Sequence, residues 1–209
     1  MIKVFFLIFE PGATWERLAA QRRSVAFILA TYLVPTLLLI AGVEGWGLLT
    51  MGKWQPGFQK FREFPLREVL VFEAAQFILA LATVFVAALL FKKINETFRE
   101  GHDYIPAFTV VAYGLSPMFL LRLLDAAPMI NPWTTWVIGV VLSIWILYQG
   151  LPRVMMPDPV HAFGLYLSGS FVVILTTGVT RLLTALYVLG QVDFHHSYLT
   201  RKLAHWLGQ

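Results

Sequence analysis

Five apolar runs, each about as long as a bilayer is thick, fill most of this 209-residue chain. A helix rising about 1.5 Å per residue needs about 20 apolar residues to cross a hydrocarbon core of about 30 Å. The runs therefore predict transmembrane helices over residues 25–43, 69–91, 104–121, 133–151 and 162–180 or beyond. We predict an all-α polytopic membrane protein, a bundle of five transmembrane helices.

Composition supports the same class. Hydrophobic residues make up 58% of the chain and charged residues 13%. A soluble helical bundle would alternate apolar and polar faces, whereas residues 133–151 carry no charge on any face. Tryptophans near the ends of the runs are typical of a membrane interface. These observations exclude a soluble bundle.

The segment before the first run predicts a short amphipathic helix. The apolar stretch 2–9 is too short to span, and Glu10 and Pro11 follow it, so we expect no cleavable signal peptide. Pro11 suits the first position of a helix, and Trp15 and Leu18 would share one face of it. We therefore divide the chain into an N-terminal interfacial segment (1–24), a transmembrane domain (25–190) and a polar tail (191–209). An ordinary juxtamembrane linker is the alternative for 1–24.

Prolines and cations shape the bundle and its orientation. Pro35 and Pro117 lie inside spans, where each removes a backbone hydrogen bond and favours a kink. Lys and Arg are nearly balanced between the two sides, which only weakly favours a cytoplasmic N-terminus. The first loop mixes aromatic residues with cations. Beside two spans this pattern indicates contact with the lipid bilayer rather than with nucleic acid.

Ionisable side chains at membrane depth are costly and mark the candidate site. The candidates form one list: Glu73, Gln76, Asp125 and Arg181. Arg122 is expected to pair locally with Asp125, three residues on, and Glu44 is expected at the interface. For Arg181 we favour snorkelling from a helix that ends at residue 180. If the helix continues to residue 190, Arg181 is buried and needs a partner such as Glu73 or Asp125.

Signals of an enzyme are absent from the sequence. The chain has no Cys, and its five His form no metal-binding pattern of the kind H-E-x-x-H. Asp193 with His195 could form a weak metal site, but a solvated polar tail is favoured. We expect no catalytic residues, no metal and no cofactor.

Three stretches resemble the Yip-one domain family in its prokaryotic branch. They read F-x-x-I-F-E-P-G-A-T-W-E-R-L near the N-terminus, V-V-A-Y-G-L-S-P in the third span and L-Y-Q-G-L-P after the fourth. The matching positions are Pro11, Trp15, Ala112, Tyr113, Pro117, Tyr148, Gly150 and Leu151, with Ala162 opening the last span.

The resemblance implies a multi-pass membrane protein with a cytosolic N-terminus, here in a prokaryotic inner membrane. Eukaryotic members engage Rab-type GTPases through a long N-terminal segment, and the 24 residues here do not carry that expectation over. We expect a non-enzymatic protein that organises the membrane or partner proteins, with homo-oligomers or other membrane proteins as partners. A small transporter or lipid-moving protein that uses Glu73, Gln76 and Arg181 is the alternative.

Overall fold

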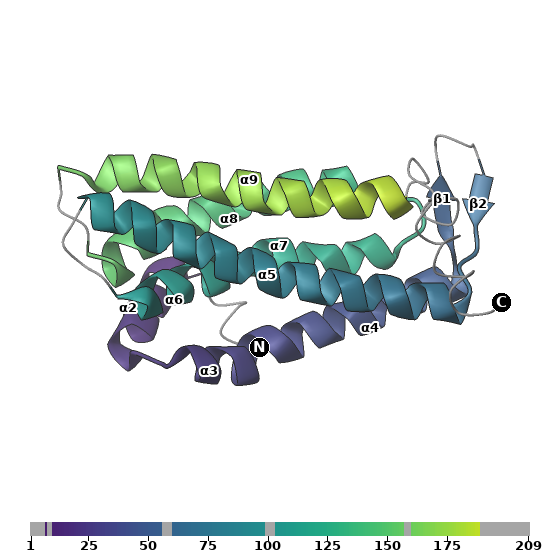
Figure 1. Cartoon of the computed structure of the whole chain (residues 1–209), viewed down its shortest axis with the longest axis horizontal. Helices are drawn as coiled ribbons and strands as arrows, with labels where there is room; N and C mark the ends of the chain where they lie inside the picture. The colour runs from purple at the N-terminus through teal and green to yellow at the C-terminus, as the bar shows by residue number, and fades with distance from the viewer. Residues whose placement is uncertain (1–6, 8–9, 56–59, 99–102, 157–159, 189–209) are drawn as a thin grey trace, which may run out of the picture.

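The computed structural model describes residues 7, 10–55, 60–98, 103–156 and 160–188. In these ranges it has five helices that are long and apolar enough to cross a membrane, as predicted. They lie roughly side by side in one elongated bundle (Figure 1). The predicted all-α bundle is confirmed. The Asp193–His195 pair and the predicted tail, residues 191–209, lie outside the described residues.

A short helix, α2 (Pro11–Gln21), precedes the spans and begins at Pro11, as predicted. The first span is continuous over Val25–Thr50 but consists of α3 (Val25–Ile28), η1 (Leu29–Leu33) and α4 (Val34–Thr50). Because Pro35 has no backbone N–H, the regular hydrogen-bond pattern fails one turn earlier. The chain responds with the π-helical turn η1, in which the N–H of Val34 reaches back five residues to the carbonyl of Leu29.

The second span is the long helix α5 (Leu66–Phe98). The third combines α6 (Tyr104–Gly114), α7 (Ser116–Leu121) and the 3₁₀ turn η2 (Arg122–Ala126), with a break just before Pro117. The fourth and fifth are α8 (Pro132–Val154) and α9 (Ala162–Val188). The helices begin close to the predicted positions, and the first four end later, because charged residues that close an apolar run are still accommodated in helices. The fifth continues beyond residue 180, to Val188, as the prediction allowed.

A β-hairpin joins the first two spans and was not predicted. Its strands are β1 (Lys53–Gln55) and β2 (Lys60–Arg62), which pair antiparallel with Trp54 opposite Phe61. Gly52 precedes it with a φ of +65°, and a side chain there would lie within 2.6 Å of the carbonyl of Arg62. Gly52 is therefore suited to the start of the hairpin for two reasons. Its backbone conformation favours glycine, and the backbone of Arg62 approaches it too closely for a side chain.

Helix α5 packs against α4, α6 and α9, while α8 contacts α2, α6, α7 and α9. The third span is the most buried of the five. The hairpin lies at one end of the bundle and α2 near the other (Figure 1). Large apolar side chains such as Val71, Ile78 and Phe171 are exposed on the outside, as expected where lipid replaces water. The polar residues of interest lie inside the end that carries the hairpin.

Candidate functional site

Six buried ionisable side chains gather near the hairpin end of the bundle. We call them the charged cluster: Glu44, Lys53, Glu73, Arg122, Asp125 and Arg181. Arg181 is followed by seven more residues of α9, which at about 1.5 Å per residue places it about 10 Å from the helix end. The cluster is thus inside the bundle rather than at its surface.

Arg181 and Asp125 form the centre of the cluster. A guanidinium nitrogen of Arg181 lies 2.5 Å from a carboxylate oxygen of Asp125, and the two side chains are 8% and 2% exposed. Arg181 also donates to the carbonyl of Pro132 and to Thr135, whose hydroxyl donates 2.7 Å to the other Asp125 oxygen. Buried charges are tolerated when pairing and further hydrogen bonds replace their water shell, and both conditions hold here.

The favoured interpretation of Arg181 is therefore wrong. Helix α9 does not end at residue 180 but continues to Val188, so the guanidinium cannot reach water by snorkelling past the helix end. The alternative, a buried Arg181 partnered by Asp125, is the arrangement in the structure.

The expected local pair of Arg122 with Asp125 is also wrong. Arg122 instead lies 2.7 Å from Glu44 on α4, and both side chains are largely buried. A local pair would have left Glu44 and Arg181 buried without partners, whereas two pairs between different spans satisfy all four charges. For the same reason Glu44 is buried inside the first span, not at the interface as predicted.

Lys53 ties the hairpin to the cluster. It is only 2% exposed, and its ammonium group donates to the carbonyls of Asp125 (2.5 Å) and Ala127 (2.9 Å). The last carbonyls of a helical segment lack partners within it, so Lys53 satisfies the end of the third span. Gln55, on the same face of β1, donates 3.1 Å to the carbonyl of Val188 at the end of α9.

The environment of Lys53 opposes its charge. Burial lowers the pKa of the Lys53 ammonium group below its ordinary value, and Asp125 and Glu44 counteract that effect by favouring the charged form. Neither Lys53 nor Gln55 was among the predicted site residues. Their two-residue spacing around Trp54 was the available signal, because it puts both on one face of a strand.

Glu73 and Gln76 are the two predicted site residues that lie on α5. Glu73 lies against Gly45, where an added side chain would come within 3.3 Å of its Cγ, and is 7% exposed. Neither Glu73 oxygen has a hydrogen-bond partner among the described residues. Gln76 is 4% exposed and lines a cavity together with Arg122 and Arg181. The structure thus brings Asp125 and Arg181 into contact and places Gln76 beside them. Glu73 lies instead against Gly45 of α4.

The cavities in this region are small. One of about 40 Å³ has a mainly apolar lining that includes Ala80 and Phe119 and also carries threonines of α5, α8 and α9. A second of about 10 Å³ lies between Glu44, Lys53 and Asp125. Since one water needs about 10–15 Å³ of such volume, together they hold only a few waters. Across the first cavity the hydroxyls of Thr83 and Thr180 are 2.7 Å apart and link α5 to α9.

The residues of the three sequence motifs meet at two other contacts. Trp15 of α2 is fully buried, and its indole N–H donates 3.2 Å to the carbonyl of Ile146 on α8. A side chain at Gly150 would come within 2.5 Å of the Trp15 ring, so only glycine leaves room for it. The apolar face of α2 therefore packs against protein, and the interfacial position of this helix stays a prediction.

The second contact joins the two kinks. The rings of Tyr32 and Tyr113 stack with centroids 4.6 Å apart, and the Tyr32 hydroxyl lies 2.6 Å from Ser116 Oγ, next to Pro117. Ala112 is buried here as well. Tyr148, by contrast, is 61% exposed and contacts only the edge of the Tyr166 ring among the aromatic contacts in the described ranges.

Comparison with curated proteins and with solved structures found no match. Comparison with protein families did: the Yip1 domain matches residues 5–181, from the start of the first motif to Arg181 in the last span. This range includes α2, both kinks and the whole charged cluster. The chain belongs to the Yip1 domain family.

Proposed function

We propose that this protein is a non-enzymatic integral membrane protein that organises the bilayer or partner proteins. One observation carries the proposal: the buried charges are used to join the spans to one another. The Glu44–Arg122 pair joins the first span to the third. Arg181 joins the fifth span to Asp125 in the third and to Thr135 and the carbonyl of Pro132 in the fourth. Such a bundle suits a structural role because its shape is fixed.

The transporter alternative rests on the cavity that Gln76 and Arg181 share. Its volume of about 40 Å³ is far below the 300–1,000 Å³ typical of ligand sites. The described residues also hold no group of three or more side chains suited to a metal. The small volume of the cavity supports a structural role over transport.

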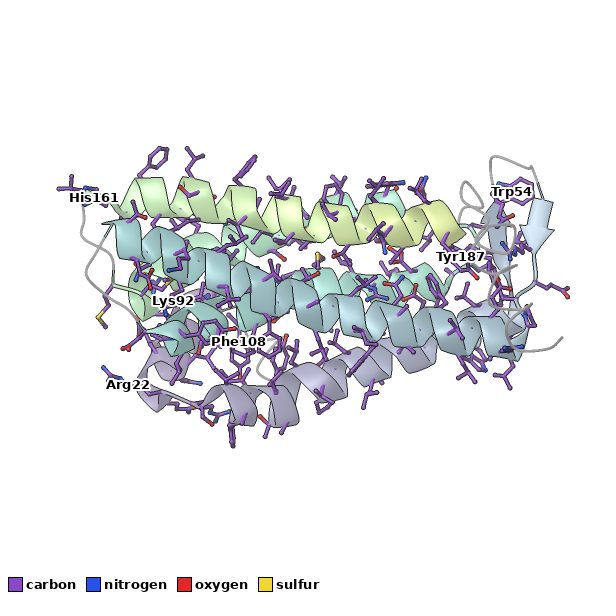
Figure 2. All side chains as sticks on the ribbon, in the orientation of Figure 1. Arg22, Trp54, Lys92, Phe108, His161 and Tyr187 are labelled. Carbon is purple, nitrogen blue, oxygen red and sulfur yellow. The ribbon has the colours of Figure 1, made fainter. Side chains whose placement is uncertain are left out.

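Surface charge supports a cytoplasmic N-terminus, in our proposal at a prokaryotic inner membrane. Lys53 and Arg122, which the sequence assigns to the hairpin side, are buried in the charged cluster. Near the α2 end Arg17, Arg22 and Lys93 are exposed, and Figure 2 shows Arg22 projecting outward from the bundle. An excess of accessible cations at that end suits the anionic cytoplasmic leaflet.

The purified chain, reconstituted in liposomes, tests the proposal. We expect it to change vesicle shape in electron cryomicroscopy, or to form crosslinked homo-oligomers, without moving solutes or fluorescent lipids across the bilayer. An unrelated helical membrane protein at equal mass is the control for shape. Flux that exceeds protein-free vesicles and is lost in Gln76→Leu would contradict the proposal and support the transporter. Absence of shape change, oligomers and partners together would also count against it.

A further inference from the structure

An apolar groove runs along the outside of the bundle between α5 and α9, and its volume is about 390 Å³. Its walls include Val71, Ala75 and Leu79 on α5 and Leu183 on α9. The volume falls within the range of ligand sites, in contrast to the inner cavities. Because both helices are membrane spans, the groove opens toward the hydrocarbon of the bilayer.

One end of the groove has the chemistry of a membrane interface. There the ring of Tyr187 stacks on Phe72 with centroids 5.4 Å apart, and its hydroxyl donates to Glu68. Glu68 in turn pairs with Arg62 of the hairpin at 2.6 Å. Figure 2 shows Tyr187 at the hairpin end of the bundle, on the same side as Trp54. Tyrosine and arginine together are typical of the headgroup level.

Arg67 is a cation on α5 at the interfacial end of the groove. Arg67, Val71, Ala75 and Leu79 follow one another at four-residue spacing, so they lie in one stripe along the helix. Arg67 is exposed and is the member of the stripe nearest the interfacial end. A guanidinium at that level complements a phosphate, and the apolar walls beyond it complement a hydrocarbon chain.

The floor of the groove separates it from the charged cluster. Gln76 and Thr184 line the groove and also both inner cavities, so these two side chains form the wall between them. Thr184 donates to the carbonyl of Arg181 in the preceding turn of α9. A hydrocarbon chain in the groove would cover this polar wall and keep water away from the buried ion pairs.

We propose that the groove between α5 and α9 binds one acyl chain of a membrane phospholipid, with the phosphate at Arg67. The site is independent of the organising function proposed above. Water is a poor occupant, because apolar walls offer it too few hydrogen bonds. The phospholipid satisfies both parts of the site, and it is the molecule present at this depth in the bilayer.

The test uses the full chain in nanodiscs that contain a phosphatidylglycerol with a diazirine in one acyl chain. After illumination, mass spectrometry locates the attached lipid, and native mass spectrometry measures the lipid retained after detergent extraction. Ala75→Trp fills the groove, whereas Ala74→Trp places the same side chain on the neighbouring exposed position outside it. Leu183→Trp and Leu182→Trp form an equivalent pair on α9, with native side chains 48% and 46% exposed.

Crosslinking at Gln76 and Thr184 and the retained lipid should both fall roughly tenfold, about 1.4 kcal/mol, in either groove variant and stay unchanged in its neighbour. Arg67→Gln should weaken capture of the phosphatidylglycerol probe but not of a diazirine diacylglycerol, which has no phosphate. Equal effects of both members of each pair would overturn the proposal, since they indicate unspecific surrounding lipid. Attachment of the groove to a second copy or to residues 189–209, in place of lipid, would overturn it as well.

Discussion

Replacing Arg181 by leucine is expected to destabilise the protein by about 3–5 kcal/mol, because it leaves the Asp125 carboxylate buried without its cationic partner. Asp125→Leu should lower the free energy of unfolding by a similar amount, because it leaves the buried Arg181 guanidinium without its carboxylate. The double variant should be far milder than the sum of the two, since it removes both charges from the interior. Unfolding in mixed detergent micelles, followed by tryptophan fluorescence, measures all three.

Arg17→Leu is the control for loss of a cation, because Arg17 is exposed on α2. Its effect should be within about 0.5 kcal/mol of zero. A similarly small effect of Arg181→Leu, or additive effects of the two cluster substitutions, would mean that the pair is not a buried unit.

Trp15→Ala is expected to have the second large effect, about 3–5 kcal/mol, on the docking of α2. The substitution removes a fully buried ring and its hydrogen bond to Ile146, and it leaves a cavity over Gly150. Hydrogen exchange should therefore accelerate in Pro11–Gln21 while the spans α5 and α9 stay protected.

Trp46→Ala provides the matched control, since Trp46 is 63% exposed on α4. It should leave exchange in α2 unchanged. Equal exchange in α2 for the two variants would show that Trp15 does not hold this helix against α8.

The sequence was sufficient to predict the five spans because a helix that crosses a hydrocarbon core needs a minimum number of consecutive apolar residues. The length of such a run can be read directly from the sequence. It also located Pro11 at a helix start and the two prolines at kinks, because each of these effects is local to the backbone. The resemblance to the Yip1 domain family rested on short motifs, and residues of two of them, Trp15 and Gly150, meet in the fold.

The pairing inside the bundle could not be predicted in the same way. Asp125 lies three residues from Arg122, yet its partner is 56 positions away on α9. Choosing between them requires knowing which helices are neighbours, and a pattern of apolar residues does not contain that information. Proximity in sequence therefore gave the wrong partners for Arg122 and Asp125.

The burial of Lys53 was missed for a related reason. A lysine in a polar loop normally faces water, and only the hairpin turns it toward the carbonyls at the end of the third span. Whether Arg181 is buried depended on where α9 ends. The apolar run suggested an end at residue 180, whereas the helix continues for about two more turns, to Val188.

The most direct test of a sealed interior uses the absence of cysteine from the chain. Thr177→Cys places a thiol in the wall of the inner cavity, and Met129→Cys places one in the exposed turn before α8. In vesicles opened to both sides, a membrane-impermeant methanethiosulfonate cation should modify Cys at position 129 rapidly and leave Cys at position 177 unmodified. Comparable modification of both would reveal a water-filled path through the charged cluster and contradict a purely structural role for it.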